Sequence, residues 1–152
     1  MRKQIRDFHP FTSTSSERVI EFSKEFDLDF IVSEDVYFAF QRVSKDFNPL
    51  HTDINFAKSK GYQDKVMYGN ILNAFVSYFV GMGLPDRNVI IQSQDIAYHE
   101  PVYLNDRLVL KTKMENYSEA TQTIVYKLRF ERIESNKNTL VAKGHVQIGL
   151  LQ

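Results

Sequence analysis

The sequence of 152 residues has no cysteine and no net charge, and both absences narrow what the protein can do. Without cysteine there can be no disulfide, thiolate nucleophile, iron–sulfur cluster or cysteine-ligated zinc site. The 19 basic and 19 acidic side chains cancel, which argues against a nucleic-acid binder held by a basic face. Hydrophobic residues make up 43% and charged residues 25%, so the balance is that of a globular protein and excludes disorder as the main state.

Long apolar runs are also missing. The most apolar stretch, residues 71–82, is interrupted by polar side chains and falls short of the roughly 20 residues that cross a bilayer. Arg2, Lys3 and Arg6 lie near the N-terminus, but the polar run 12–16 follows where a signal peptide needs an apolar segment. We therefore expect a cytoplasmic protein without a membrane span, which the lack of cysteine also fits.

The length corresponds to one domain, since domains typically hold about 100–200 residues. Neither an internal repeat nor a linker divides the chain. We expect an irregular N-terminal arm over residues 1–16 and a single folded domain over residues 17–152.

Three segments carry helical signals. Residues 33–46 open with a serine and two acids, which is typical of an N-cap and a first helical turn. Asn48-Pro49 then predicts a turn or a new N-cap, and a short helix is expected over 53–60. The third helix, over 69–82, has a broad apolar face and is the candidate for the centre of the core.

In the remaining segments, apolar and polar residues alternate as they do in β-strands. Strand-like alternation occurs within 19–32, and four longer strands are expected at 89–98, 107–116, 121–133 and 140–150. Helices between a first strand and a run of later strands indicate the α+β class. The predicted architecture is an antiparallel meander wrapped against one central apolar helix.

A carboxylate and an imidazole lie five positions apart across a helix-stopping turn. Because the chain must turn at Asn48-Pro49, Asp46 and His51 can converge on one pocket. Such a pair is suited to holding a water molecule and moving its proton. The alternative is purely structural, with Asp46 ending a helix and His51 packing in a loop.

Other chemistry finds little support in the sequence. Gly81-Met82-Gly83 follows a helix rather than a strand, so it is not a dinucleotide-binding loop. None of the four histidines has the partner four positions away that a helical zinc site uses. They are His9, His51, His99 and His145. We therefore expect no metal and no cofactor.

The segment Asp46-Phe47-Asn48-Pro49-Leu50-His51 resembles the hydratase-2 motif of the MaoC-like (R)-specific enoyl-CoA hydratases. The similarity extends over roughly residues 32–151, most of the chain, with further matching positions in the right order. These are Asp53, Phe56, Ala57, Gly61-Tyr62, Gly69, Leu84-Pro85, Pro101-Val102 and Asn105-Asp106. The resemblance implies a hotdog fold, an antiparallel sheet wrapped around a long helix, and usually a homodimer.

The resemblance also implies roles for individual residues. Asp46 and His51 match the catalytic dyad, and Asn48 matches a residue that helps to order the site and is expected to border the substrate. Gly69 matches the glycine whose backbone N–H contributes to an oxyanion hole. A glycine admits a thioester carbonyl closely, and a helix N-terminus supplies an unpaired N–H. Close helix packing is the alternative role for this glycine.

Two residues depart from the family pattern. Tyr68 and Asn70 flank Gly69, where the family commonly has His and Met, and Ala74 replaces a common serine. Both flanking residues are expected at the substrate-binding rim. The Tyr68 hydroxyl would either face the acyl channel, favouring short or polar acyl groups, or lie in solvent.

The resemblance implies a hydro-lyase that adds water reversibly to an enoyl thioester and yields an (R)-3-hydroxyacyl product. The acyl group of the substrate would be linked as a thioester to coenzyme A or to an acyl carrier, and no separate cofactor is needed. Alternatives are a hotdog thioesterase, a carrier-protein dehydratase, or a non-catalytic acyl-thioester-binding protein. Thioesterases usually place a carboxylate on the central helix, and residues 69–82 contain none.

Overall fold

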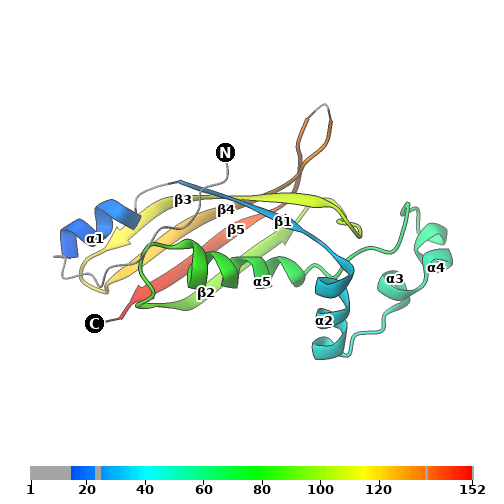
Figure 1. Cartoon of the computed structure of the whole chain (residues 1–152), viewed down its shortest axis with the longest axis horizontal. Coiled ribbons are helices and arrows are strands. Elements are labelled where there is room, and N and C mark those ends of the chain that lie inside the picture. Colours follow the sequence, from blue (N-terminus) through cyan, green and yellow to red (C-terminus); the bar gives the residue numbers. More distant parts are fainter. Residues whose placement is uncertain (1–14, 23–24, 136, 152) are drawn as a thin grey trace.

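One antiparallel sheet of five strands dominates the computed structural model, which describes residues 15–22, 25–135 and 137–151. Helix α5 lies along one face of this sheet (Figure 1). The strands are β1 (Phe26–Ile31), β2 (Val89–Tyr98), β3 (Arg107–Ser118), β4 (Thr123–Arg132) and β5 (Thr139–Leu150). The predicted α+β class with a central helix is confirmed.

Helices fill the chain between β1 and β2 and precede β1. They are α1 (Ser15–Phe22), α2 (Glu34–Ser44), α3 (Pro49–Thr52), α4 (Ile54–Ser59) and α5 (Ile71–Tyr78), which continues as a π-helical turn, η1 (Phe79–Gly83). Among the described residues, no helix is both long and apolar enough to cross a membrane.

The strand order is β1-β3-β4-β5-β2, so the predicted meander holds only for β3, β4 and β5. Strand β2 pairs with β5 at one edge of the sheet and not with β3, the next strand in sequence. Alternation identifies a strand but not its neighbour, because any strand with one buried face can join any edge. Gly144 permits this pairing, since a Cβ there would lie 1.8 Å from the backbone oxygen of Asp95 on β2.

The N-terminal part of the described chain forms a helix that was not predicted. Residues 15 and 16 of the expected irregular arm belong to α1, which ends at Phe22, and the alternation expected within 19–32 forms strand β1 at Phe26–Ile31. Phe22 is fully buried, and its carbonyl accepts a hydrogen bond from the Tyr126 hydroxyl. Residues 1–14 of the expected arm lie outside the described residues.

The core lies between α5 and the sheet. Four side chains of α5 are buried, and the buried residues of β4 from Ile124 to Phe130 alternate with half-buried or exposed ones. The rings of Phe79 and Tyr126 meet edge to face, with centroids 5.2 Å apart. Burying each large apolar side chain contributes roughly 1.5–3 kcal/mol, so this layer holds the fold together.

Helices α2, α3 and α4 gather at the N-terminal end of α5 (Figure 1). The Ser33 side chain caps α2 as expected, and Lys45, at a φ of 55°, ends it. Asn48 caps α3 with Pro49 at its first turn, and Asp53 caps α4. These caps satisfy the free N–H groups of short helices and so fix the path of the chain between α2 and α4.

Candidate active site

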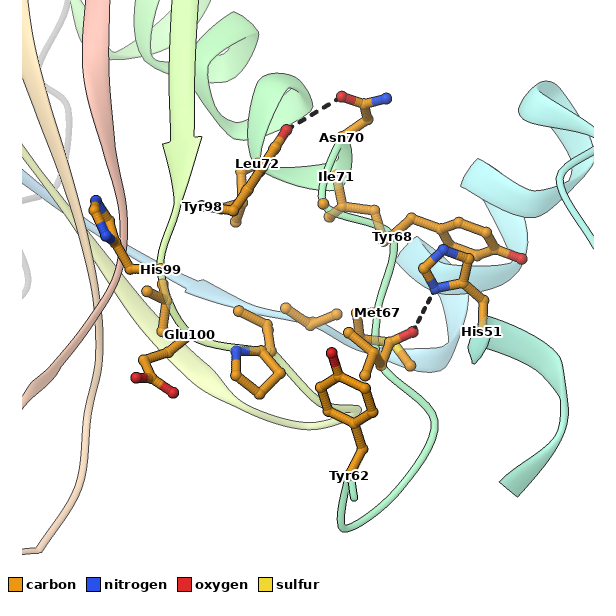
Figure 2. A pocket seen from close by; sticks show the side chains of 16 residues that line it. His51, Tyr62, Met67, Tyr68, Asn70, Ile71, Leu72, Tyr98, His99 and Glu100 are labelled. Carbon is orange, nitrogen blue, oxygen red and sulfur yellow. Dashed lines mark hydrogen bonds between the residues drawn. The ribbon is translucent and has the colours of Figure 1, made fainter. Parts of the chain in front are cut away.

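A pocket of about 400 Å³ opens at the N-terminal end of α5 (Figure 2). Its walls come from the start of α5, the end of β2 and the segment before α5. Half of the sixteen lining residues have purely apolar side chains: Val32, Val66, Met67, Ile71, Leu72, Pro101, Val102 and Val141. A small number of polar groups on apolar walls is the usual composition of a site for a small organic ligand.

Asp46 and His51 come together at this pocket. Their side chains approach to 3.9 Å between Asp46 Oδ2 and His51 Nε2. The histidine side chain is 16% exposed and lines the pocket, whereas the carboxylate is 45% exposed and does not line it. The backbone N–H of Asn48 donates to Asp46 Oδ1 at 2.9 Å, which leaves Oδ2 as the oxygen nearer the imidazole.

The hydrogen bonding of His51 determines which ring nitrogen bears the proton. Its Nδ1 lies 2.7 Å from the carbonyl oxygen of Val66 (Figure 2). Because a carbonyl only accepts, Nδ1 must donate, and the neutral ring then has its lone pair on Nε2. In that form Nε2 and the Asp46 carboxylate are both acceptors, so they form no hydrogen bond with each other across the 3.9 Å between them. One donor molecule, such as water, can bond to both.

Gly69 lies in the pocket wall just before α5. The backbone N–H groups of Gly69 and Asn70 have no acceptor among the described residues. Both belong to the positive end of the α5 dipole, where negative charge is stabilised. A Cβ at Gly69 would lie 3.0 Å from ring atoms of Tyr98, so the glycine also makes room for that ring.

Asn48 has a local role in the structure. Its side-chain oxygen accepts from the N–H of Leu50 at 2.9 Å and caps α3, and the residue does not line the pocket. Its own N–H binds Asp46, so the residue orders the turn that holds the dyad. This geometry fits the ordering role that the resemblance implied better than contact with substrate.

Tyr68 departs from both positions expected for its hydroxyl. The residue is 3% exposed, and its hydroxyl donates to the backbone oxygen of Asp46 at 2.7 Å, so it faces neither the acyl channel nor solvent. A buried phenol needs a polar partner, and the turn after α2 provides one. Tyr68 lines the pocket, and its ring centroid lies 4.3 Å from that of the His51 imidazole.

Asn70 lines the pocket as expected, but its side chain is engaged within the protein. Its oxygen accepts from the Tyr98 hydroxyl at 3.2 Å and from the Asn73 amide at 3.0 Å. Partial burial raises the pKa of Tyr98, so its phenol stays protonated and donates at neutral pH. Asn70 thus helps to place the Tyr98 ring over Gly69.

Four polar lining residues were missed by sequence reasoning: Tyr62, Tyr98, His99 and Glu100. Tyr62 lies on the side of the cavity away from Asn70 and Tyr98 (Figure 2). A signal existed in the run Tyr98-His99-Glu100, which begins at the last residue of β2 and leads into Pro101. Among the described residues, no group of acidic and histidine side chains is arranged to hold a metal ion.

Comparison with known proteins identifies the family of this chain and several relatives. Residues 12–136 match the profile of the MaoC like domain. The chain belongs to the MaoC-like domain family. It is 30% identical over 76 residues to an (R)-specific enoyl-CoA hydratase of Aeromonas caviae, a match that covers 50% of this chain and 57% of that protein. It is 23% identical over 112 residues to a mitochondrial 3-hydroxyacyl-[acyl-carrier-protein] dehydratase of Arabidopsis thaliana, which covers 74% and 66%. The chain thus spans less than two thirds of these relatives.

Solved structures share the fold of this MaoC-like chain. The (R)-hydratase of Aeromonas caviae superposes with a TM-score of 0.75 at 23% identity, covering 84% of this chain and 95% of that one. An R-hydratase of Pseudomonas aeruginosa gives 0.74 at 20% identity, covering 86% and 81%. The hotdog fold and the family resemblance are confirmed.

Proposed function

We propose that this MaoC-like protein is a hydro-lyase that adds water reversibly to an enoyl thioester, with an (R)-3-hydroxyacyl thioester as the hydrated product. The observation that carries the proposal is the pair of acceptors, His51 Nε2 and Asp46 Oδ2, 3.9 Å apart at an apolar pocket. Distant similarity to enoyl-CoA hydratases and acyl-carrier dehydratases supports the same reaction class.

A water molecule held by both acceptors would donate one hydrogen to each. In the hydration direction its oxygen attacks the β-carbon of the enoyl group while one acceptor removes a proton. The pair then returns a proton to the α-carbon, so that one C–O and one C–H bond form as the double bond is lost. The proposal assigns both proton transfers to the pair of Asp46 and His51, and neither transfer to one residue alone.

The thioester oxygen gains negative charge as the nucleophile adds, and the start of α5 is suited to stabilise it. The free N–H of Gly69 lies in the pocket wall at the positive end of the helix. A single preorganised donor of this kind is worth about 10²–10³-fold in rate in other enzymes. The step needs no metal and no redox cofactor.

The acyl group of the substrate would be bound as a thioester to coenzyme A or to an acyl carrier. The preference for short or polar acyl groups expected from the Tyr68 hydroxyl loses its basis, because that hydroxyl binds Asp46. The apolar pocket walls suit an acyl chain, and the polar groups of Tyr62, His99 and Glu100 border the same space.

The direct test is the loss of enoyl absorbance when crotonyl-CoA is mixed with the protein. Loss of absorbance with formation of the (R)-3-hydroxy product is the expected result. Release of free thiol without hydration would indicate a thioesterase instead, and binding without either reaction would indicate a non-catalytic acyl-thioester protein. Either outcome would overturn the proposal. Helix α5 and η1 carry no carboxylate, which favours hydration over thioester hydrolysis.

We further propose that the protein forms a homodimer. Strand β2 lies at an edge of the sheet, and large apolar side chains on it, Ile90 and Tyr98, are 52% and 50% exposed. Such an edge is a natural surface for a second copy. Light scattering at micromolar concentration should give twice the mass of the chain, and a monomer would contradict the proposal.

A further inference from the structure

Gln41 on α2 contacts two tyrosine hydroxyls with one side-chain amide. Its Nε2 lies 3.4 Å from the hydroxyl of Tyr37 and 3.2 Å from that of Tyr68. An amide nitrogen only donates and carries two hydrogens, so one hydrogen is available for each phenol. Tyr37 and Gln41 are four residues apart and therefore share one face of α2.

Each phenol passes a hydrogen bond on to the backbone of one dyad residue. The Tyr68 hydroxyl donates to the carbonyl of Asp46 at 2.7 Å, and the Tyr37 hydroxyl donates to the carbonyl of His51 at 3.0 Å. One amide thus links, through two phenols, to both residues whose side chains are 3.9 Å apart.

Packing holds this network in place. Tyr37 and Tyr68 are 4% and 3% exposed, and their rings stack with centroids 5.4 Å apart. Burial and the neighbouring Tyr68 raise the pKa of Tyr37 to about 12, so this phenol remains a donor at neutral pH. Figure 2 shows the Tyr68 ring against the imidazole of His51, with its hydroxyl directed away from the cavity.

The turn that carries Asp46 has little else to anchor it to the core. Residues 42–49 are exposed, and the side-chain hydrogen bonds of Asp46 and Asn48 stay within the turn. The phenol of Tyr68 reaches it from 22 positions away in the sequence. Without such a tie, the carboxylate could move relative to a histidine that Val66 and Tyr37 already fix.

We propose that Gln41, Tyr37 and Tyr68 form a clamp that sets the spacing of Asp46 and His51. The inference rests on the proposed hydratase function and makes these three positioning residues rather than catalytic ones. A dyad that shares one water tolerates little displacement, since a shift of about 1 Å in a reacting group can cost about 10²-fold in rate.

Tyr68→Phe removes the central hydroxyl and keeps the ring. In hydration of crotonyl-CoA, kcat should fall roughly 10- to 100-fold while KM stays within about twofold, because substrate contacts are kept and alignment is lost. Tyr37→Phe should lower kcat less, because the Nδ1 bond to Val66 still holds the ring of His51. Gln41→Leu should lower kcat less than the double variant Tyr37→Phe/Tyr68→Phe, because both phenols keep their own hydrogen bonds to the carbonyls of Asp46 and His51.

Tyr126→Phe is the matched control. Its hydroxyl is also buried and donates to a backbone carbonyl, that of Phe22, but Tyr126 does not line the pocket. This variant should lose thermal stability as Tyr68→Phe does and keep the kcat of the wild-type protein. An equal loss of kcat in both variants would show a general folding effect and overturn the clamp.

Hydrogen exchange of backbone amides tests the clamp independently of whether the protein hydrates an enoyl thioester. Backbone amides of residues 45–53 should exchange about tenfold faster in Tyr68→Phe and at the wild-type rate in Tyr126→Phe. If the wild-type protein hydrates no enoyl thioester, the function proposal fails, and exchange still tests the clamp. Unchanged exchange in Tyr68→Phe, or an unchanged kcat in an active protein, would overturn the clamp.

Discussion

The layer between α5 and the sheet and the segment between α2 and α5 are held by different forces. In the layer, side chains such as Leu128 and Ile148 are fully buried, and stability comes from apolar packing. At the start of the segment, residues 45–49 are exposed, and capped turns and single hydrogen bonds fix the chain there. The first region therefore determines whether the protein folds, and the second determines where the side chains of Asp46 and His51 lie.

Because different forces hold the two regions, we expect substitutions in them to change different properties of the protein. Loss of a packed side chain should lower the free energy of unfolding before it changes the pocket. Loss of a polar group in the segment should lower turnover by a much larger factor than its effect on thermal stability would explain.

Asp46→Asn should give the largest effect on function. The amide keeps an oxygen that can accept from the Asn48 N–H, so the turn survives, but it cannot take up a proton. Hydration should fall about 10²–10⁴-fold, the usual contribution of a general acid or base. Turnover of crotonyl-CoA and a melting curve together provide the measurement.

Asp53→Asn is its control within the same segment. Asp53 caps α4 through its side-chain oxygen, and asparagine caps a helix about as well as aspartate. This variant should keep near-native turnover. Native turnover in Asp46→Asn would remove the dyad from the mechanism.

Leu128→Ala should give the largest effect on the fold. Leu128 lies fully buried on β4, and removing it leaves a cavity that costs about 2–5 kcal/mol of unfolding free energy. Urea unfolding should show this loss, while the folded fraction keeps most of its turnover. Lys127→Ala, at the neighbouring exposed position, should unfold like the wild-type protein. Equal losses in the two variants would contradict the assignment of the core face.

Features that depend on residues close together in the sequence could be predicted from it. Ser33 and Asn48 were recognised as caps because capping depends on neighbours within three residues, and the four later strands were found by their alternation. The meeting of Asp46 and His51 followed from a turn of known chemistry.

Features that depend on distant parts of the chain were missed. Helix α1 (Ser15–Phe22) was not predicted and begins within the expected irregular arm, and β2 pairs with β5 rather than β3. The bond from Tyr68 to Asp46 spans 22 positions, and that from Gln41 to Tyr68 spans 27. No local pattern encodes such contacts, because they exist only once α2 and the start of α5 are packed together.

The smallest effect is expected from the polar face of the sheet, where Glu131 is only 7% exposed. Its carboxylate accepts from Arg129, from Lys111 at 2.9 Å and from Asn138 at 3.3 Å. The Arg129 hydrogen bond, aided by Lys111 and Asn138 and opposed by burial, lowers the pKa of Glu131 to about 2. The ionised form is therefore the one that the folded state favours.

A carboxyl with a lowered pKa stabilises the fold at pH values above its unfolded pKa of about 4.5, and that stabilisation disappears as the pH falls toward 2. Glu131→Gln should thus cost roughly 1–3 kcal/mol of unfolding free energy at pH 7, as a hydrogen-bonded buried charge is lost. The difference from wild type should shrink between pH 4.5 and 2, as measured by urea unfolding. Glu25→Gln, which removes an exposed partner of Lys113, should change stability little at any pH. A cost for Glu131→Gln that is the same at pH 7 and pH 3 would mean that packing, and not charge, holds this side chain.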